Sequence, residues 1–272
     1  MPKYCSEGKK MTNHEIPKDH PRYQSLFTRE SIIEGMHKRI VAEAGLIAHG
    51  RGEAFDYLLG EETPQFALKQ ERLAVIYLLL AKKPVISVNG NVAVLCPEEI
   101  IELGKVLEAP LEINLFYRTR ERELAIETAM KEAGAEKLLG IDPKKQTTIE
   151  EISHQRRIVD VNGIAISDCV FVPLEDGDRT QALKHLQKEV ITVDLNPLSR
   201  TSLTASVSIT NNITRAVNEM VEIGRELKQL SREDLTIERS KLSNDELLEN
   251  ALNFMSNRLA SLAKEISTKQ NK

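Results

Sequence analysis

Tryptophan is absent from the chain, and aromatic residues of all kinds make up only 4% of it. Proteins that bind single-stranded nucleic acid stack its bases on aromatic side chains, so this scarcity argues against such a surface. The formal net charge is −4, and lysine and arginine are spread evenly, without a basic stripe that would contact a phosphate backbone. We therefore expect no nucleic acid among the partners of this protein.

Cysteine is also rare: Cys5, Cys96 and Cys169 lie far apart and form no CxxC pair. An odd and scattered set of this kind indicates neither a disulfide framework nor a zinc site. Cys96 and Cys169 stand within apolar runs, and we expect them to be small buried hydrophobic residues.

Long hydrophobic runs are missing as well. None approaches the roughly 18 residues that span a bilayer, and the N-terminus lacks the apolar core of a secretion signal. These absences predict a soluble, cytoplasmic protein with no membrane partner. Residues 1–15 are polar and without periodicity, so we expect a disordered tail there, within which Met11 is an alternative start to Met1.

Short β-branched runs alternate with helical patterns through the middle of the chain. The expected strands span residues 84–88, 111–116, 169–173, 190–194 and 205–210. The expected helices span residues 65–82, 97–107, 119–133, 179–187 and 212–230. Strands that alternate with helices in this way predict an α/β fold, with a Rossmann-like, mostly parallel sheet and helices on both faces.

Helical additions are expected at both ends of this sheet. We predict one α/β catalytic domain at 16–230, beginning with a helical segment at 16–83, and a C-terminal helical extension at 231–272. The charged stretch 142–162 interrupts the alternation and is expected to be a solvated surface insertion. The extension carries apolar residues at near-heptad spacing, which should pack on the domain or on a second subunit: Leu247, Leu248, Leu252, Met255, Leu259 and Leu262.

The segment AHGRGEAFDYLLGE, which begins at Ala48, is the most concentrated set of chemical groups in the chain. It places an imidazole, a guanidinium and two carboxylates beside two glycines: His49, Arg51, Glu53 and Asp56. Such a set can bind an anion, hold a metal and move a proton, and a glycine backbone can approach a ligand closely. The same pattern is also typical of a glycine-rich turn that opens an amphipathic helix. It is no dinucleotide fingerprint, because Phe55 stands where the GxGxxG motif requires its third glycine.

Polar and charged residues follow five consecutive expected strands. These strand ends read Asn89-Gly90-Asn91, Tyr117-Arg118-Thr119-Arg120, Glu175-Asp176-Gly177-Asp178-Arg179, Asp194 to Thr201, and Asn211-Asn212. Any one of them could be an ordinary turn or helix cap. Five together, at the edge where parallel sheets bind ligands, favour a site. Acids supply Mg²⁺ ligands, arginines contact phosphates, and amides and helix N-termini donate hydrogen bonds, so a phosphorylated ligand such as a nucleotide is expected.

Two common nucleotide-binding signatures are missing. The chain contains neither a GxxxxGK[ST] phosphate loop nor the protein-kinase signature set. A nucleotide would therefore have to be bound by a less common arrangement of residues.

Six long blocks carry a resemblance to a known family. They are HPRYQSL at 20–26, GLIAHGRGEAFDYLLGE at 45–61, PVISVNGNVA at 84–93, EINLFYRT at 112–119, VPLEDGDR at 172–179 and DLNPLSRT at 194–201. Together they strongly resemble the archaeal phosphopantothenate synthetases, the 4-phosphopantoate–β-alanine ligases of coenzyme A biosynthesis. The resemblance covers about residues 16–230 and excludes the 142–162 stretch and the tail.

The resemblance implies a reaction and an assembly. ATP, 4-phosphopantoate and β-alanine would give AMP, pyrophosphate and 4′-phosphopantothenate through an acyl adenylate, with Mg²⁺, in a homodimer. Two alternatives remain: a small-molecule kinase acting on a hydroxy acid, and a non-catalytic nucleotide-binding regulatory module. Each would have a similar sheet but a different nucleotide product, or none.

The same resemblance implies roles for individual residues. The expected ATP-binding residues are Arg29, Arg51, Asp194, Leu195, Asn196, Arg200, Thr201, Asn212 and Ile213. Asp194 would hold the ribose hydroxyls or, alternatively, Mg²⁺. The expected residues around 4-phosphopantoate are Asn89, Gly90, Asn91, Arg118, Glu175, Asp176, Asp178 and Arg179, with Arg51 at hand.

His49 and Glu53 are the expected catalytic residues. Histidine titrates near neutral pH and can take a proton from the attacking amine or stabilise the charge of the adenylate. Glu53 would orient the imidazole or bind Mg²⁺, and the sequence does not decide between these roles.

Overall fold

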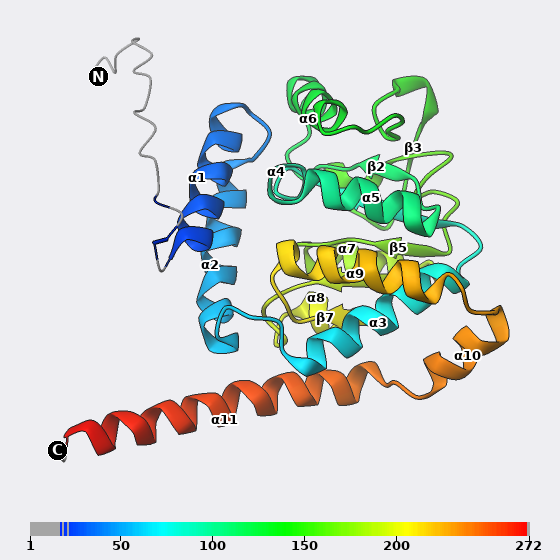
Figure 1. The fold of residues 1–272 in the computed structure, drawn as a ribbon. Helices are drawn as coiled ribbons and strands as arrows, with labels where there is room; N and C mark the ends of the chain where they lie inside the picture. Colours follow the sequence, from blue (N-terminus) through cyan, green and yellow to red (C-terminus); the bar gives the residue numbers. More distant parts are fainter. Residues whose placement is uncertain (1–16, 18, 21, 271–272) are drawn as a thin grey trace, which may run out of the picture.

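The computed structural model describes residue 17, residues 19–20 and residues 22–270. The tail expected at residues 1–15 lies outside this part of the chain. A five-stranded parallel sheet forms the centre of the fold, in the order β2-β1-β5-β6-β7 (Figure 1). Its strands are β1 (Pro84–Val88), β2 (Leu111–Ile113), β5 (Cys169–Phe171), β6 (Glu189–Val193) and β7 (Val207–Ile209). The α/β, Rossmann-like fold expected from the sequence is confirmed.

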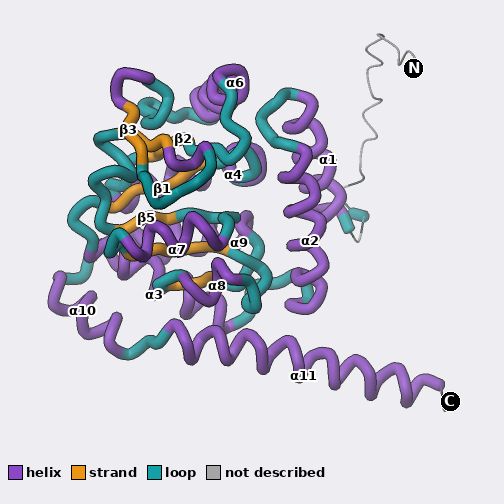
Figure 2. Tube along the Cα trace, turned by 180° about the vertical axis from the view of Figure 1, so that it is seen from behind, coloured by secondary structure: helices purple, strands orange, loops and turns teal. Residues whose placement is uncertain are grey.

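Successive strand residues point to opposite faces of the sheet, and helices cover both faces, so side chains on both sides are buried. One face packs on helices α3 (Gln65–Leu80), α5 (Pro97–Leu107) and α9 (Ile213–Leu227) through Ile86, Val88, Phe171, Ile191 and Val193. The other face meets helix α7 (Gly177–His185), seen from behind in Figure 2, through Val85, Val170, Val172 and Val190. This two-sided burial explains why Val and Ile predominate in the strands, and the expected strand and helix positions are confirmed to within a few residues.

The prediction of a solvated insertion at 142–162 is only partly right, because most of its residues are exposed but the stretch is folded and contributes buried side chains. The stretch contains the short 3-10 helix η1 (Pro143–Lys145), an antiparallel hairpin of β3 (Gln146–Thr148) and β4 (Ile158–Asp160), and a second 3-10 helix, η2 (Gln155–Arg157). Ile149, Ile152 and Val159 are buried and pack in the same cluster as the sheet face that α7 covers. These apolar residues stand at irregular intervals among charges, so no periodicity revealed them.

Helices α1 (Tyr23–His37) and α2 (Glu43–Leu59) stand beside the carboxyl edge of the sheet (Figures 1 and 2). Helix α2 continues through Gly50 and Gly52, so the glycine-rich turn considered from the sequence does not form. The helix ends instead at Gly60, whose φ of 89° gives the left-handed cap that glycine favours. Shorter helices follow the strands: α4 (Val92–Leu95), α6 (Arg120–Glu132) and α8 (Arg200–Thr204).

Two helices, α10 (Arg232–Ser240) and α11 (Asn244–Gln270), form the C-terminal part. The first half of α11 packs on the domain and buries four apolar residues: Leu247, Leu248, Ala251 and Met255. The second half extends past the rest of the chain (Figure 1), and Leu259 there is 50% exposed. Within the described residues, no helix has the length and apolar character that crossing a membrane requires.

Candidate functional site

The crevice between the carboxyl ends of β1 and β5 is where the sheet changes winding direction. The chain leaves β1 toward β2 on one side and leaves β5 toward β6 on the other, and such a switch point is the usual ligand site of a parallel sheet. Asn89 holds the crevice together: its Nδ2 donates to the Pro173 carbonyl at 2.9 Å, and its Oδ1 accepts from the Val92 amide at 3.1 Å. Gly90 must be glycine, because a Cβ there would lie 2.2 Å from the Ile40 carbonyl oxygen.

Two adjoining cavities open at this edge. The first, here called the β6 cavity, has a volume of about 320 Å³ and lies between α2, the loop after β6 and the start of α9. The second, here called the β1 cavity, has a volume of about 390 Å³ and lies between α2, the loop after β1 and the residues after β2. Both are lined by Arg51, Asn91, Leu174 and Glu175, so two ligands bound there would be neighbours.

The β6 cavity gathers most of the expected ATP-binding residues: Arg51, Asp194, Leu195, Asn196, Thr201, Asn212 and Ile213. The Asp194 carboxylate accepts from the Ser199 hydroxyl and, at 2.9 Å, from the Asn196 amide. Burial raises the pKa of Asp194, while these two hydrogen bonds and the charge of Arg51 oppose the shift. The backbone amides at the start of α9 add a partial positive charge suited to an anion.

His49 and Glu53 lie one turn apart on α2 and line the β6 cavity. Glu53 accepts a hydrogen bond from the Ser25 hydroxyl at 3.0 Å. The His49 Nε2 atom is buried and has no hydrogen-bond partner among the described residues. Burial lowers the pKa of His49 below its ordinary 6.5, although Glu53 and Asp56 partly raise it, so the imidazole is neutral at pH 7 and able to accept a proton.

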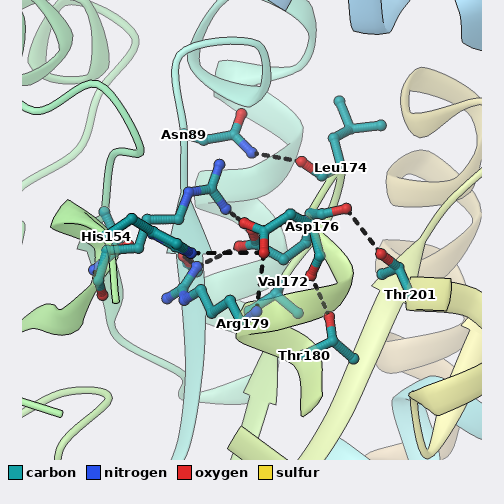
Figure 3. Close-up of polar contacts among 12 residues, drawn as sticks. Asn89, His154, Val172, Leu174, Asp176, Arg179, Thr180 and Thr201 are labelled. Atoms are coloured by element: carbon teal, nitrogen blue, oxygen red, sulfur yellow. Dashed lines mark hydrogen bonds and ion pairs between the residues drawn. The ribbon is translucent and has the colours of Figure 1, made fainter. Parts of the chain in front are cut away.

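A buried charge cluster forms the floor between the cavities at Glu175, which lines both. Figure 3 draws the polar contacts around two of its members, Asp176 and Arg179. The Glu175 carboxylate, 1% exposed, is ion-paired with both Arg156 and Arg179. Burial lowers the pKa of Arg156 to about 9 and that of Arg179 to about 10. Asp176 caps α7 by accepting from the Arg179 amide at 2.9 Å, and Thr201 donates to the Glu175 carbonyl at 3.1 Å. The cluster therefore ties the loop after β5 to the β3–β4 hairpin and to α8.

Several expected site residues lie outside both cavities. Arg29 is exposed, with Glu30 at 4.0 Å, and Arg200 pairs with Asp178 on the surface. The Arg118 guanidinium is turned inward, where it pairs with Glu123 and donates to the carbonyls of Gly140 and Ile158. Arg179 lies beneath the floor, is fully buried and lines neither cavity.

Among the residues that line these two cavities, sequence reasoning missed four with polar or charged side chains: Tyr117, Arg122, Arg156 and Ser199. Tyr117 and Ser199 belong to strand-end segments that the sequence did single out. Arg122 lies four residues after Arg118, in the first turn of α6, and a sequence does not reveal which of the two faces the cavity. Arg156 belongs to the stretch that we expected to be solvated.

No group of three or more His, Cys, Asp or Glu side chains in the described part of the chain is arranged to hold a metal ion. The carboxylates at the β6 cavity are also partly engaged in ion pairs and hydrogen bonds within the protein. Glu175 is neutralised by two arginines, and both Asp194 oxygens accept hydrogen bonds. Glu53 uses one oxygen for Ser25 and has the most capacity left for a cation.

The fold is an α/β fold with two adjoining, charge-lined cavities at the switch point of its parallel sheet. Residues 66–258 match the phosphopantothenate/pantothenate synthetase family. The chain belongs to this family.

The sequences of similar proteins align with nearly the whole chain. It is 54% identical to the 4-phosphopantoate–β-alanine ligase of Thermococcus kodakarensis over 251 residues, which cover 92% of this chain and 95% of that protein. It is 46% identical to the 4-phosphopantoate–β-alanine ligase of Methanosarcina mazei, with 92% and 98% covered.

Proposed function

We propose that this protein is the ATP-dependent ligase that condenses 4-phosphopantoate with β-alanine to 4′-phosphopantothenate, with release of AMP and pyrophosphate, in the cytoplasm. The relatives carry this acid and this amine in their names. The observation that carries the proposal is the pair of adjoining cavities with a shared wall of Arg51, Asn91, Leu174 and Glu175. A carboxylate activated by ATP needs this arrangement, because holding the acid and the nucleotide together supplies much of the rate.

ATP occupies the β6 cavity in this proposal. Asp194 holds the ribose hydroxyls, since the bonds from Ser199 and Asn196 fix its carboxylate in a hydrogen-bonding role. The start of α9, at Asn212 and Ile213, faces the phosphates, where helix amides favour negative charge. Arg51 supplies a cation that both cavities share.

The acid occupies the β1 cavity, against Asn89, Gly90 and Asn91. Its carboxylate oxygen attacks the α-phosphorus of ATP, the bond to pyrophosphate breaks, and the acyl adenylate forms. Arg51 stabilises the charge that develops on the α-phosphate. The expected contacts of Arg29, Arg118 and Arg200 are not part of this proposal, because these residues lie outside both cavities.

The amine attacks the acyl carbon in the second step, and AMP leaves. A third cavity of about 330 Å³ adjoins the β6 cavity along α2, where the two share His49 and Glu53, and it is also lined by Asp56, Glu61 and Arg215. Arg215 pairs with Asp56 in this cavity, so Glu61 is the carboxylate that we assign to the ammonium of β-alanine. The neutral His49 imidazole takes the proton that the amine loses, and Glu53 lies next to it on the helix.

Mg²⁺ fits this site as a partner of the ATP triphosphate. It would enter bound to ATP and would partly neutralise the negative charge of the phosphates. Mg²⁺ is commonly held by one or two carboxylates together with substrate phosphates. Glu53 is the carboxylate that we assign to it, because Asp194 and Glu175 are already engaged.

Nucleotide analysis tests the proposed reaction. With ATP, 4-phosphopantoate and β-alanine present, AMP should accumulate in step with 4′-phosphopantothenate, and omission of either acid or amine should abolish product. Release of ADP would instead identify a kinase acting on the acid. The absence of any nucleotide turnover would indicate a regulatory module.

The protein is proposed to act as a homodimer that pairs through the second half of α11. Leu259, Leu262 and Ile266 form one exposed apolar stripe there, which Leu252 continues into the first half of the helix. A helix that projects from its domain with such a stripe needs a partner to be stable in water.

The double variant Leu259→Glu/Leu262→Glu should therefore halve the mass measured by light scattering. Ser261→Glu, on the opposite side of the helix, should leave the mass unchanged. A wild-type protein that is monomeric at micromolar concentration would contradict the assignment.

A further inference from the structure

Helix α9 is joined at its start to helix α2 by an ion pair that neither the β6 cavity nor the β1 cavity exposes. The Nη1 and Nη2 atoms of Arg215, in the first turn of α9, donate to the two carboxylate oxygens of Asp56 on α2, at 3.2 and 2.5 Å. The Nε atom of Arg215 donates to the side-chain oxygen of Asn211 at 3.1 Å. Asp56 also accepts from the Nδ2 atom of Asn212 at 3.0 Å. These four residues are here called the α2–α9 clamp.

The clamp is anchored in the core on helix α3. Asn211 is fully buried, and its Nδ2 atom donates to the Glu71 carboxyl at 2.8 Å and to the Thr63 hydroxyl at 3.1 Å. Burial and the negative charge of Glu219 raise the pKa of Glu71 to about 8, although the bond from Asn211 and the charge of Arg215 oppose the shift. Glu71 is therefore mostly neutral at pH 7 and leaves the guanidinium of Arg215 to its pair with Asp56.

The clamp holds the one residue of the β6 cavity that begins α9. Asn212 lines that cavity, and both ends of its side-chain amide are engaged: the oxygen accepts from the Thr214 amide at 3.2 Å, and the nitrogen donates to Asp56. Asp56 lies on the same helix as His49 and Glu53, three residues after the latter. In the described part of the chain, side-chain hydrogen bonds join α2 to α9 at Asp56 alone.

An ion pair of this kind serves geometry more than stability. Asp56 is only 6% exposed, and a buried pair seldom stabilises a fold more than an apolar pair of the same size would. A bidentate pair fixes both the distance and the orientation of the two elements that carry it. Reacting groups need such fixed placement, because small displacements from the productive geometry are costly in rate.

We infer that Asp56 and Arg215 are positioning residues, whose ion pair sets the start of α9 against α2 and thereby aligns the phosphates of ATP with His49 and Glu53. This inference rests on the proposed function, in which ATP occupies the β6 cavity. Neither Asp56 nor Arg215 lines that cavity, so both act through Asn212, which does. They line the third cavity instead, on the side of α2 that carries His49 and Glu53.

Calorimetric titration of Asp56→Asn and Arg215→Met tests the clamp. Each substitution should raise the Kd for ATP roughly 10-fold and lower kcat on the order of 10- to 100-fold, because the phosphates lose their alignment. The Kd for 4-phosphopantoate should be unchanged, since neither residue lines the β1 cavity. ATP is titrated without β-alanine, because Arg215 also lines the third cavity.

Arg72→Met is the matched control. Arg72 pairs with Glu226 near the other end of α9, and its side chain is 29% exposed, against 25% for Arg215. The substitution therefore removes an ion pair of similar exposure from the same helix. It should leave the affinity for ATP and kcat unchanged, so a general loosening of α9 is separated from a shift of its start.

Two further variants show whether the pair acts as a unit. Asp56→Asn/Arg215→Met should bind ATP no more weakly than the weaker single variant, because both substitutions break the same pair. Arg215→Lys keeps the charge and should recover part of the affinity, which keeps the test open even if Arg215→Met does not fold.

Three results would overturn the positioning role: unchanged ATP binding in the folded variants, equal losses for ATP and 4-phosphopantoate, or fully additive losses in the double variant. A wild-type protein that binds ATP without forming AMP, with the variants weakened as expected, would overturn the proposed reaction and keep the clamp.

Discussion

Replacing His49 by glutamine is expected to lower turnover by about 100-fold or more while ATP binding is retained. Glutamine keeps the size and hydrogen bonding of the side chain but cannot accept a proton near pH 7. Loss of general acid–base participation typically costs this much. Steady-state turnover and ATP titration of the variant give the two readouts.

The pH profile gives a check that a packing defect would not reproduce. Burial lowers the pKa of His49 below 6.5, so the neutral, proton-accepting form dominates above that value. In the wild type, kcat should therefore fall as the pH drops, with a midpoint below 6.5, and the His49→Gln variant should lose this limb. His185→Gln, an exposed histidine on α7, is the control. Turnover of His49→Gln within about threefold of wild type would show that His49 is only part of the scaffold.

Arg179→Met should destabilise the protein by about 3–5 kcal/mol. The Arg179 side chain is fully buried, pairs with Glu175 and donates to the Ser87 hydroxyl at 3.2 Å. Removing one partner of a buried ion pair leaves charge that the rest of the cluster compensates poorly. Urea unfolding monitored by circular dichroism measures the loss.

Arg200→Met is the control for this substitution. Arg200 pairs with Asp178, but both side chains are more than 60% exposed, and surface pairs contribute roughly 0–1 kcal/mol. Equal effects of the two substitutions would contradict the structural role of the buried cluster.

The sheet could be predicted from the sequence because its strands are buried on both faces. Val85–Val88 and Val190–Val193 are runs of Val and Ile interrupted only by Ser87 and Thr192, and helices lie between the successive strands. The topology then brings the ends of β1, β5 and β6 together, which is why residues as distant as Asn89 and Asp194 line adjoining cavities.

The directions in which individual side chains point could not be predicted from the sequence. Arg118 and Arg122 are both arginines and lie four residues apart, yet Arg118 is held by Glu123 and two carbonyls while Arg122 lines the β1 cavity. Arg156 illustrates the same limit. Its burial depends on the hairpin packing against a sheet face that is distant in sequence, which no local pattern encodes.

The most direct test of the central claim follows the carboxylate oxygens of 4-phosphopantoate after labelling with a heavy isotope. Formation of an acyl adenylate joins one of these oxygens to the α-phosphorus, and attack by β-alanine leaves it there. Mass spectrometry should therefore find the label in AMP, one oxygen atom for each 4′-phosphopantothenate formed. Label in inorganic phosphate, with ADP as the nucleotide product, would contradict the account.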